Sequence, residues 1–165
     1  MKRRIWMFLA AIAVALAPRV AHAQQYLIGV SGEASDGVEM GTAVPFKPAR
    51  VRARLGLDLR VDEFPSDIFC VGLLTDILPH TQFGVDARYA HMMSKHFEVN
   101  VGAIGYLAPS TLFGPSADLK YHMTLGATTD LIFGPEVNVF IFGGDLPSGT
   151  VFVQTLLTAG IHANF

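Results

Sequence analysis

The sequence predicts an all-β protein, an eight-stranded antiparallel up-and-down transmembrane β-barrel. Three observations carry this prediction: an N-terminus typical of an export signal, a hydropathy period of two along the rest of the chain, and charges confined to one face of the predicted strands. We expect the 165 residues to divide into a cleaved signal peptide, residues 1–23, and one barrel domain, residues 24–165.

The first segment has the three parts of a secretory signal peptide. Lys2, Arg3 and Arg4 are basic, residues 5–16 are an unbroken apolar run, and residues 21–23 read Ala-His-Ala, a small-x-small cleavage pattern. A membrane-spanning helix needs about 20 apolar residues, so this run is too short for a permanent anchor. We therefore expect export and cleavage.

Charge and cysteine content exclude some classes of protein. Four of the twelve basic residues lie in the predicted signal, and the mature chain then has a net charge of about −6. A nucleic-acid-binding surface needs clustered basic residues, so no nucleic-acid partner is expected. Cys70 is the single cysteine, so an internal disulfide is impossible.

The hydropathy of the mature chain alternates with the period of a β-strand that has two different faces. In residues 50–62 every even position is polar, charged or glycine and every odd position is apolar. Similar alternation gives eight predicted strands, near residues 25–33, 50–62, 67–78, 82–91, 96–107, 116–127, 131–142 and 150–165. A transmembrane strand needs about 9–11 residues, which fits these lengths better than the roughly five or six of an ordinary strand.

Turn-forming residues separate the predicted strands. Residues 62–66, 92–95 and 128–130 are short connectors, and the alternate connectors are residues 34–49, 78–81, 108–115 and 143–149. Short turns at one end and longer loops at the other are typical of outer-membrane barrels. Both ends of the mature chain are then expected at the short-turn, periplasmic end.

The charged face is expected to line the lumen, because an Arg or Lys facing lipid at the midplane costs about 2–4 kcal/mol. Charges of both signs can pair in an enclosed interior. The simplest interpretation is a set of structural ion pairs, and the alternative is a narrow passage for ions or small solutes. The predicted lumen charge network comprises Arg52, Arg54, Arg60, Arg88, Glu98, Lys120, His122 and Glu136.

The last strand ends on Phe165 with Ile161 and Leu157 on the same face, and this resembles the terminal strand by which outer-membrane barrels are recognised for assembly. Over its mature length the chain resembles the small eight-stranded outer-membrane β-barrel proteins of OmpA/OmpX-type or OmpW-type architecture, without a family-specific motif. The resemblance implies a monomer in the outer membrane of a Gram-negative bacterium, in contact with outer-membrane lipid and delivered by the barrel-assembly machinery.

The inward positions near the longer loops are apolar. They could form an apolar cup that binds a small hydrophobic ligand, although a simple apolar closure or a slip of register near the loops would give the same pattern. The predicted cup comprises Ile104, Tyr106, Phe140, Phe142, Phe152 and Leu156.

A lipid-modifying enzyme would need a nucleophile and a His that a carboxylate orients. The nearest pattern is His122 with Thr124, but threonine is a poor nucleophile and nothing in the sequence places a carboxylate beside His122. His80, His91 and His96 show no metal-ligand spacing. We therefore expect no catalytic residue, metal or cofactor.

The resulting prediction is a non-enzymatic, porin-like outer-membrane barrel with a structural role, or with a narrow passage or binding cup for small or hydrophobic molecules. The first alternative is a soluble, exported, lipocalin-like ligand-binding barrel in which the two faces of the strands are reversed. An outer-membrane enzyme that modifies lipid is the second alternative.

Overall fold

The computed structural model describes residues 26–42, 46–48, 51–61, 63–78, 80–144, 146 and 148–165. The expected signal peptide lies outside these residues. In the described part no helix is both long and apolar enough to cross a membrane. The strands are β1 (Tyr26–Gly41), β2 (Lys47–Pro48), β3 (Arg52–Val61), β4 (Asp67–Asp76), β5 (Gln82–Met92), β6 (Phe97–Ala108), β7 (Leu112–Thr124), β8 (Thr129–Phe140) and β9 (Phe152–Asn164).

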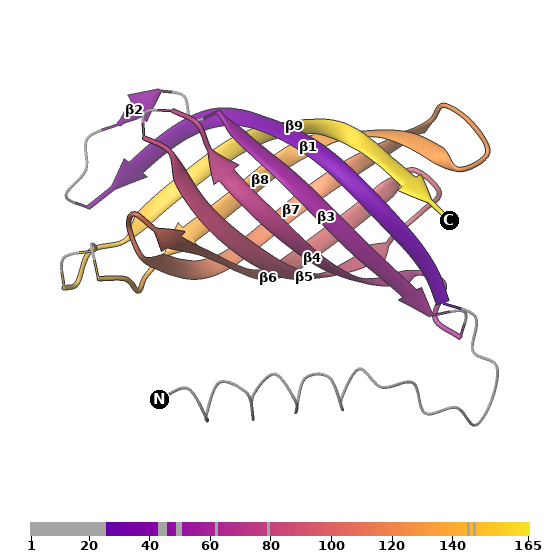
Figure 1. Cartoon of the computed structure of the whole chain (residues 1–165), viewed down its shortest axis with the longest axis horizontal. Coiled ribbons are helices and arrows are strands. Elements are labelled where there is room, and N and C mark those ends of the chain that lie inside the picture. Colours follow the sequence, from indigo (N-terminus) through magenta and orange to yellow (C-terminus); the bar gives the residue numbers. More distant parts are fainter. Residues whose placement is uncertain are drawn as a thin grey trace.

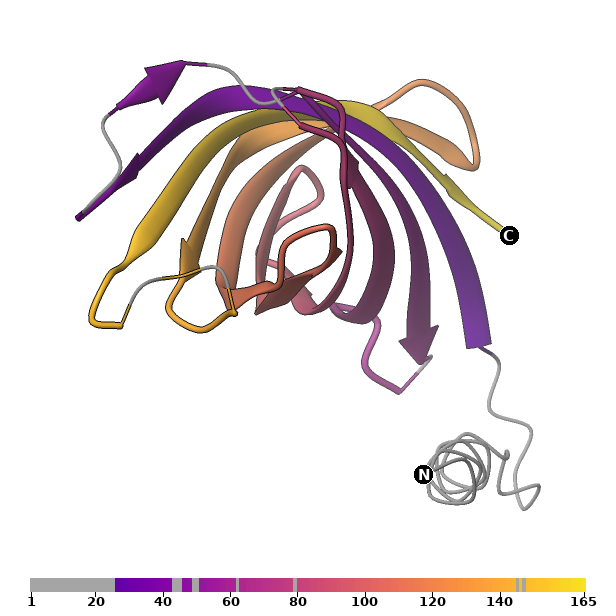
Figure 2. The same cartoon turned by 60° about the vertical axis from the view of Figure 1, so that its left-hand side comes forward.

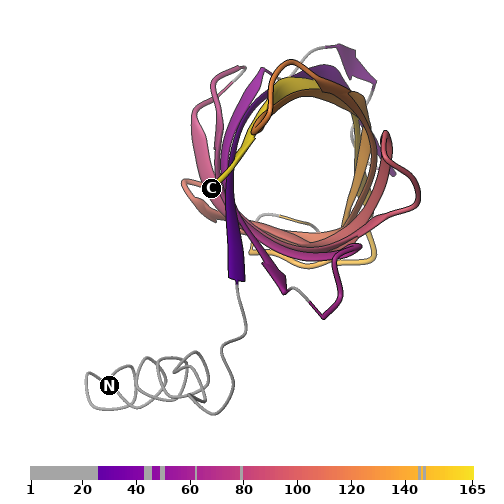
Figure 3. The ribbon, with the colours of Figure 1, turned by 90° about the vertical axis from the view of Figure 1, so that its right-hand side faces the viewer.

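Eight of these strands close into a barrel, as Figure 3 shows in a view along its axis. Consecutive strands from β3 to β9 pair antiparallel, and β1 closes the ring by pairing with β3 on one side and with β9 on the other. The two-residue β2 lies outside the ring and pairs with β1 at Val38 and Glu39 (Figure 2). The predicted eight-stranded antiparallel barrel is thus confirmed.

The alternation in sequence becomes an alternation between interior and exterior. In β3, Arg52, Arg54 and Asp58 are buried in the barrel, whereas Leu55 and Leu57 are exposed on its outside. The same alternation recurs in β4 to β9, because successive side chains of a strand point to opposite faces. The charged face is therefore the inside, which is the opposite of the lipocalin-like alternative.

The connectors differ between the two ends of the barrel (Figure 1). The connectors between β3 and β4, between β5 and β6, and between β7 and β8 lie at the end where β1 begins and β9 ends, and we name this the short-turn end. The connectors that follow β1, β4, β6 and β8 lie at the opposite end, which we name the loop end. Two expected loops are shorter than predicted, because β1 continues to Gly41 and β7 already begins at Leu112.

The predicted inward position of Phe142 is wrong, because its side chain lies on the outside of the barrel. Its side chain is 67% exposed, since β8 ends at Phe140 and Phe142 instead forms an isolated bridge with the outward-facing Phe113. The regular β7–β8 register, in which Ser116 faces Asn138, would place Ile141 opposite Phe113. The pairing is therefore shifted by one residue, which turns Phe142 to the outer face.

Apolar side chains are buried at both ends of the interior, with the charged residues between them. The loop-end cluster is formed by Leu74, Ile104, Tyr106, Leu112, Phe140 and Phe152, with Leu146 packed against it. The short-turn cluster is smaller and consists of Ile68, Cys70 and Ala90, with Met92 against it. The apolar loop end was predicted, whereas the apolar patch at the short-turn end was not.

Candidate functional site

The barrel interior holds most of the buried charged side chains, and Arg52 lies on the loop-end side of this charged section, next to Tyr106 of the loop-end cluster. The guanidinium donates hydrogen bonds to Asp76 Oδ1 at 3.1 Å and to Glu136 Oε1 at 2.6 Å. Its Nη2 also donates to the Tyr106 hydroxyl at 2.7 Å and to Gln154 Oε1 at 2.5 Å. Arg52 is thus fully paired although it is 1% exposed, as a buried guanidinium must be.

Arg54 forms the next layer toward the short-turn end. It donates to Glu33 Oε1 at 2.7 Å and to Asp86 Oδ2 at 2.8 Å. Two inward glycines make room for it: a Cβ on Gly72 would lie 2.7 Å from Arg54 Nε, and a Cβ on Gly56 would lie 2.6 Å from Arg54 Nη1. A side chain at either position would displace Arg54 or its neighbours, because the guanidinium lies directly over the backbone.

Arg88 joins the two layers. Its Nε lies 2.6 Å from Asp86 Oδ2, and its Nη1 pairs with Asp118 and lies 3.3 Å from Glu136 Oε2. The Asn100 amide then donates to Asp118 Oδ1 at 2.6 Å and to Glu98 Oε1 at 2.7 Å. The result is a continuous network of ion pairs and hydrogen bonds along the lumen.

Acidic groups outnumber basic groups among the buried, described residues. The buried cations are Arg52, Arg54, Arg88 and Lys120. The buried carboxyl groups are those of Glu33, Glu39, Asp58, Asp76, Asp86, Glu98, Asp118 and Glu136. Lys120 Nζ donates to Glu33 Oε1 at 2.8 Å. An interior with this balance attracts cations rather than anions.

Most of the predicted lumen charge network lies where the alternation placed it. Seven of its eight members are buried in the interior: Arg52, Arg54, Arg88, Glu98, Lys120, His122 and Glu136. Arg60 is half-buried near the short-turn end, and its Nε has no hydrogen-bond partner among the described residues. Five of the six predicted cup residues are also buried: Ile104, Tyr106, Phe140, Phe152 and Leu156.

The predicted cup is packed rather than hollow. Phe140 packs between Tyr106 and Phe152 with tilted rings, whose centroids are 5.5 Å and 5.7 Å away. Tyr106 and Phe140 are 0% exposed, so these rings occupy the centre of the loop end. This packing favours closure of the barrel over an open ligand site, and binding of a small hydrophobic molecule stays a prediction.

Sequence reasoning missed the carboxylates around His122. His122 Nε2 lies 3.2 Å from Glu98 Oε2, and its Nδ1 lies 3.6 Å from Asp130 Oδ2. The signal was present in the alternation, because Glu98 faces Lys120 across the β6–β7 ladder and His122 follows Lys120 on the same face. Carboxylate oxygens thus lie near both ring nitrogens of His122, at 3.2 Å and 3.6 Å.

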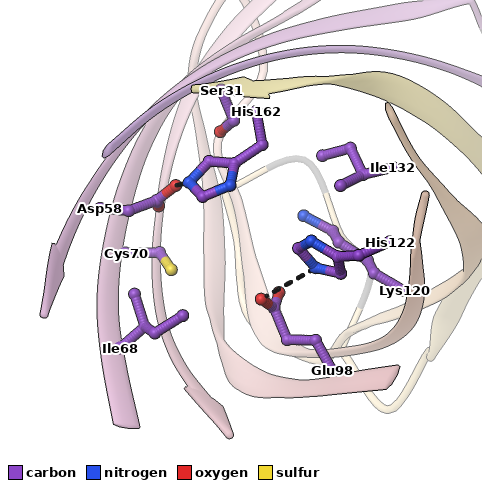
Figure 4. A pocket seen from close by; sticks show the side chains of 9 residues that line it. All are labelled: Ser31, Asp58, Ile68, Cys70, Glu98, Lys120, His122, Ile132 and His162. Atoms are coloured by element: carbon purple, nitrogen blue, oxygen red, sulfur yellow. Dashed lines mark ion pairs between the residues drawn. The ribbon is translucent and has the colours of Figure 1, made fainter. Parts of the chain in front are cut away.

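A second pair at the same end was also missed. His162 Nε2 lies 3.2 Å from Asp58 Oδ2. Both His–carboxylate pairs line a cavity of about 10 Å³, large enough for roughly one water molecule, and Figure 4 shows the two imidazoles on its opposite sides.

No protein-family model matches the chain, and no curated protein matches its sequence. Its structure is similar to the crystal structure of Neisserial surface protein A, with a TM-score of 0.61, 11% sequence identity, and coverage of 87% of this chain and 100% of that chain. A de novo designed transmembrane β-barrel is matched with a TM-score of 0.46, 13% identity, and coverage of 83% and 95%. The likeness to Neisserial surface protein A supports an outer-membrane-type eight-stranded barrel fold.

Proposed function

We propose that the chain is an integral outer-membrane barrel with a structural role, and that its lumen is closed to solutes. The observation that carries this proposal is the reversed polarity of the barrel, which has charges inside and an apolar outer surface. Exposed large apolar side chains come from every strand of the ring, among them Val30, Leu57, Val71, Val85, Val101, Leu119, Val137 and Leu157.

A membrane is the environment that fits this outer surface. Soluble monomers rarely expose contiguous apolar patches larger than a few hundred Å². Here the apolar surface includes a groove of about 450 Å³, whose lining includes Ala87, Ala103, Gly105, Phe113 and Phe142. A hydrocarbon chain fits such a groove better than water does.

Closure of the lumen is supported by the pairing of its charges. Arg52 reaches partners on four other strands, and Arg88 bridges three carboxylates. Separating one buried ion pair costs about 3–5 kcal/mol. A solute larger than water would have to separate several pairs at once. The charged interior is therefore better explained by ion pairs that stabilise the barrel than by conduction of solutes.

The remaining parts of the proposal concern chemistry and partners. A non-enzymatic role fits the carboxylates that flank both nitrogens of His122. Delivery by the barrel-assembly machinery fits the last residue, Phe165, whose side chain is 77% exposed and whose backbone N–H donates to Ile28 O at 2.8 Å. In the described part of the chain each strand of the ring is paired on both sides, which supports a monomer in the outer membrane of a Gram-negative bacterium.

The experiment expresses the full chain in a Gram-negative host, separates the membranes, and compares boiled with unboiled samples on a gel. We expect outer-membrane recovery, loss of residues 1–23 by mass spectrometry, and a mobility shift on boiling. Recovery in the soluble periplasmic fraction would contradict the proposal.

A flux measurement then tests the closed lumen. Proteoliposomes that contain the wild-type barrel should swell in a small sugar no faster than empty liposomes. The variant R52S/E136S removes a pair that crosses the lumen, and it should swell faster. Wild-type swelling clearly faster than that of empty liposomes would replace the structural role with a passage.

A further inference from the structure

Three side chains capable of binding a metal converge at the short-turn end of the lumen. They are His122 on β7, Asp130 on β8 and His162 on β9, and one ligand atom from each lies within 4.8 Å of the other two. The register explains the convergence, because Asp130 is directly opposite His162 and Ile132 is directly opposite His122. Adjacent strands of a closed sheet hold these groups, so their spacing is fixed by the backbone.

Each imidazole has a carboxylate close to its Nε2 atom. His122 Nε2 lies 3.2 Å from Glu98 Oε2, and His162 Nε2 lies 3.2 Å from Asp58 Oδ2 (Figure 4). Histidines that bind metals almost always place their second ring nitrogen against a carboxylate, a carbonyl or water. Here both rings have a carboxylate oxygen 3.2 Å from Nε2, so the Nδ1 atoms of His122 and His162 are the atoms that face Asp130 and the lumen for a ligand.

The Nδ1 atom of His162 is the strongest single indication. It is buried, and it has no hydrogen-bond partner in the part of the chain that the structure describes. His162 is 5% exposed, and such buried polar atoms are rarely left unsatisfied. The ring also fits closely against the backbone, because a Cβ on Gly29 would lie 2.6 Å from His162 Nε2.

We propose that His122, Asp130 and His162 bind a divalent transition metal ion of the Zn²⁺ class. Tetrahedral Zn²⁺ with bonds of about 2.0–2.1 Å places neighbouring ligand atoms about 3.3 Å apart. His122 Nδ1 and Asp130 Oδ2 are already 3.6 Å apart, so His162 has the larger adjustment to make. Two imidazoles and one carboxylate leave a fourth position for water.

The surroundings favour a cation of this class. The carboxylates of Glu98 and Asp58 lie behind the two imidazoles and compensate the charge of a divalent ion. Two nitrogen ligands select Zn²⁺, Ni²⁺ or Cu²⁺ over Ca²⁺ and Mg²⁺, which prefer oxygen. The Asp130 side chain is 22% exposed, which gives the ion a route from solvent.

The test uses the mature chain without a polyhistidine tag, folded in detergent and treated with a chelator. Co²⁺ is added and its ligand-field absorption is recorded, and Zn²⁺ is then added as a competitor. We expect one Co²⁺ per chain, displaced by one Zn²⁺. Absence of Co²⁺ binding by the wild-type protein would overturn the proposal.

Substitutions distinguish Co²⁺ binding at the proposed site from Co²⁺ binding at other histidines. Asp130→Asn and His162→Ala should each weaken binding by about 100-fold or more, and Asp58→Asn by about 10–100-fold. His91→Ala is the matched control, because His91 also pairs with a carboxylate at this end, Asp67 Oδ1 at 2.7 Å, but on the exposed surface. It should bind Co²⁺ as the wild type does.

Each variant is first shown to be folded by its mobility shift on boiling. Asp130→Asn keeps this comparison informative if His162→Ala fails to fold, because Asp130 is only partly buried. Equal loss of affinity in His91→Ala and Asp130→Asn would assign the binding to surface histidines and would contradict the proposed site.

Discussion

Arg52 Nη1 on β3 lies 2.6 Å from Glu136 Oε1 on β8, although the two residues are 84 positions apart and their strands are not neighbours. The pair therefore crosses the lumen. The same guanidinium also contacts Asp76 on β4, Tyr106 on β6 and Gln154 on β9. One side chain thus links five of the eight strands of the ring, independently of the backbone ladders.

Removal of the Glu136 charge should weaken the barrel strongly. Glu136→Gln keeps the size of the side chain but leaves Arg52 and Arg88 without a shared carboxylate. Breaking a buried pair costs about 3–5 kcal/mol, because the remaining charge stays buried. The measurement is the free energy of unfolding by urea in phospholipid vesicles.

The control for this variant is Glu63→Gln, which makes the same chemical change on an exposed side chain of a short turn. It should leave the free energy of unfolding unchanged within about 0.5 kcal/mol. An equal loss in both variants would show that the overall charge, rather than the pairing across the lumen, determines stability.

The inward glycines beneath Arg54 give a second prediction. Gly72→Ala places a methyl group 2.7 Å from Arg54 Nε and should displace the Arg54–Asp86 pair. Overpacking of this kind costs about 1–3 kcal/mol in the free energy of unfolding. Gly32→Ala is the matched control, since the nearest atom to its new Cβ, on Leu55, would be 4.0 Å away. Urea unfolding of both variants should show a loss for Gly72→Ala alone.

The sequence predicts the strands well where one face is charged and the other apolar, as in residues 50–62. It fails where the outward residues are small or polar. Residues 34–41 of β1 include the exposed Asp36, so their period of two is hidden, and pairing with β9 extends the strand nevertheless. Gly114 and Pro115 suggest a loop, but Pro115 faces outward in β7 opposite Ala103.

Local alternation does not show how one strand is aligned with the strand that it pairs with. Phe142 has the correct parity for an inward residue, yet the one-residue shift against Phe113 turns it outward. In the same way, His122 and His162 lie far apart in the sequence, and their ring centroids lie 6.0 Å apart in the structure. Pairing of the adjacent strands β7, β8 and β9 produced the candidate metal site, and no spacing along the chain reveals it.

The Tyr106 hydroxyl gives a third prediction about the loop end of the lumen. It donates to Asp76 Oδ1 at 2.8 Å and accepts from Arg52 Nη2, both in a fully buried setting. Tyr106→Phe preserves the packing against Phe140 but removes both hydrogen bonds. Hydrogen bonds to charged groups contribute about 1.5–3 kcal/mol, so a loss of that order is expected in urea unfolding.

The matched substitution is Tyr89→Phe. The Tyr89 hydroxyl donates to Asp67 Oδ1 at 2.7 Å, a nearly identical hydrogen bond, but the side chain is 39% exposed. Its removal should change stability much less, because solvent replaces the lost partner. Equal losses in the two variants would show that burial does not strengthen the Tyr106 hydrogen bonds.

The outer surface provides the last prediction, which separates a membrane barrel from a soluble one. Leu57 lies at the middle of β3 and is 42% exposed on the outer face, opposite Val71. In a membrane, Leu57→Arg places a charge in hydrocarbon and should lower the free energy of unfolding by about 2–4 kcal/mol. In water the same charge would be solvated, so the substitution would change the free energy of unfolding very little. The control, Phe64→Arg, changes a 60% exposed residue in a short turn, where the cost should fall to about 0–1 kcal/mol. Urea unfolding in vesicles measures both variants, and a Leu57→Arg cost no greater than that of Phe64→Arg would mean that this face of β3 does not contact lipid.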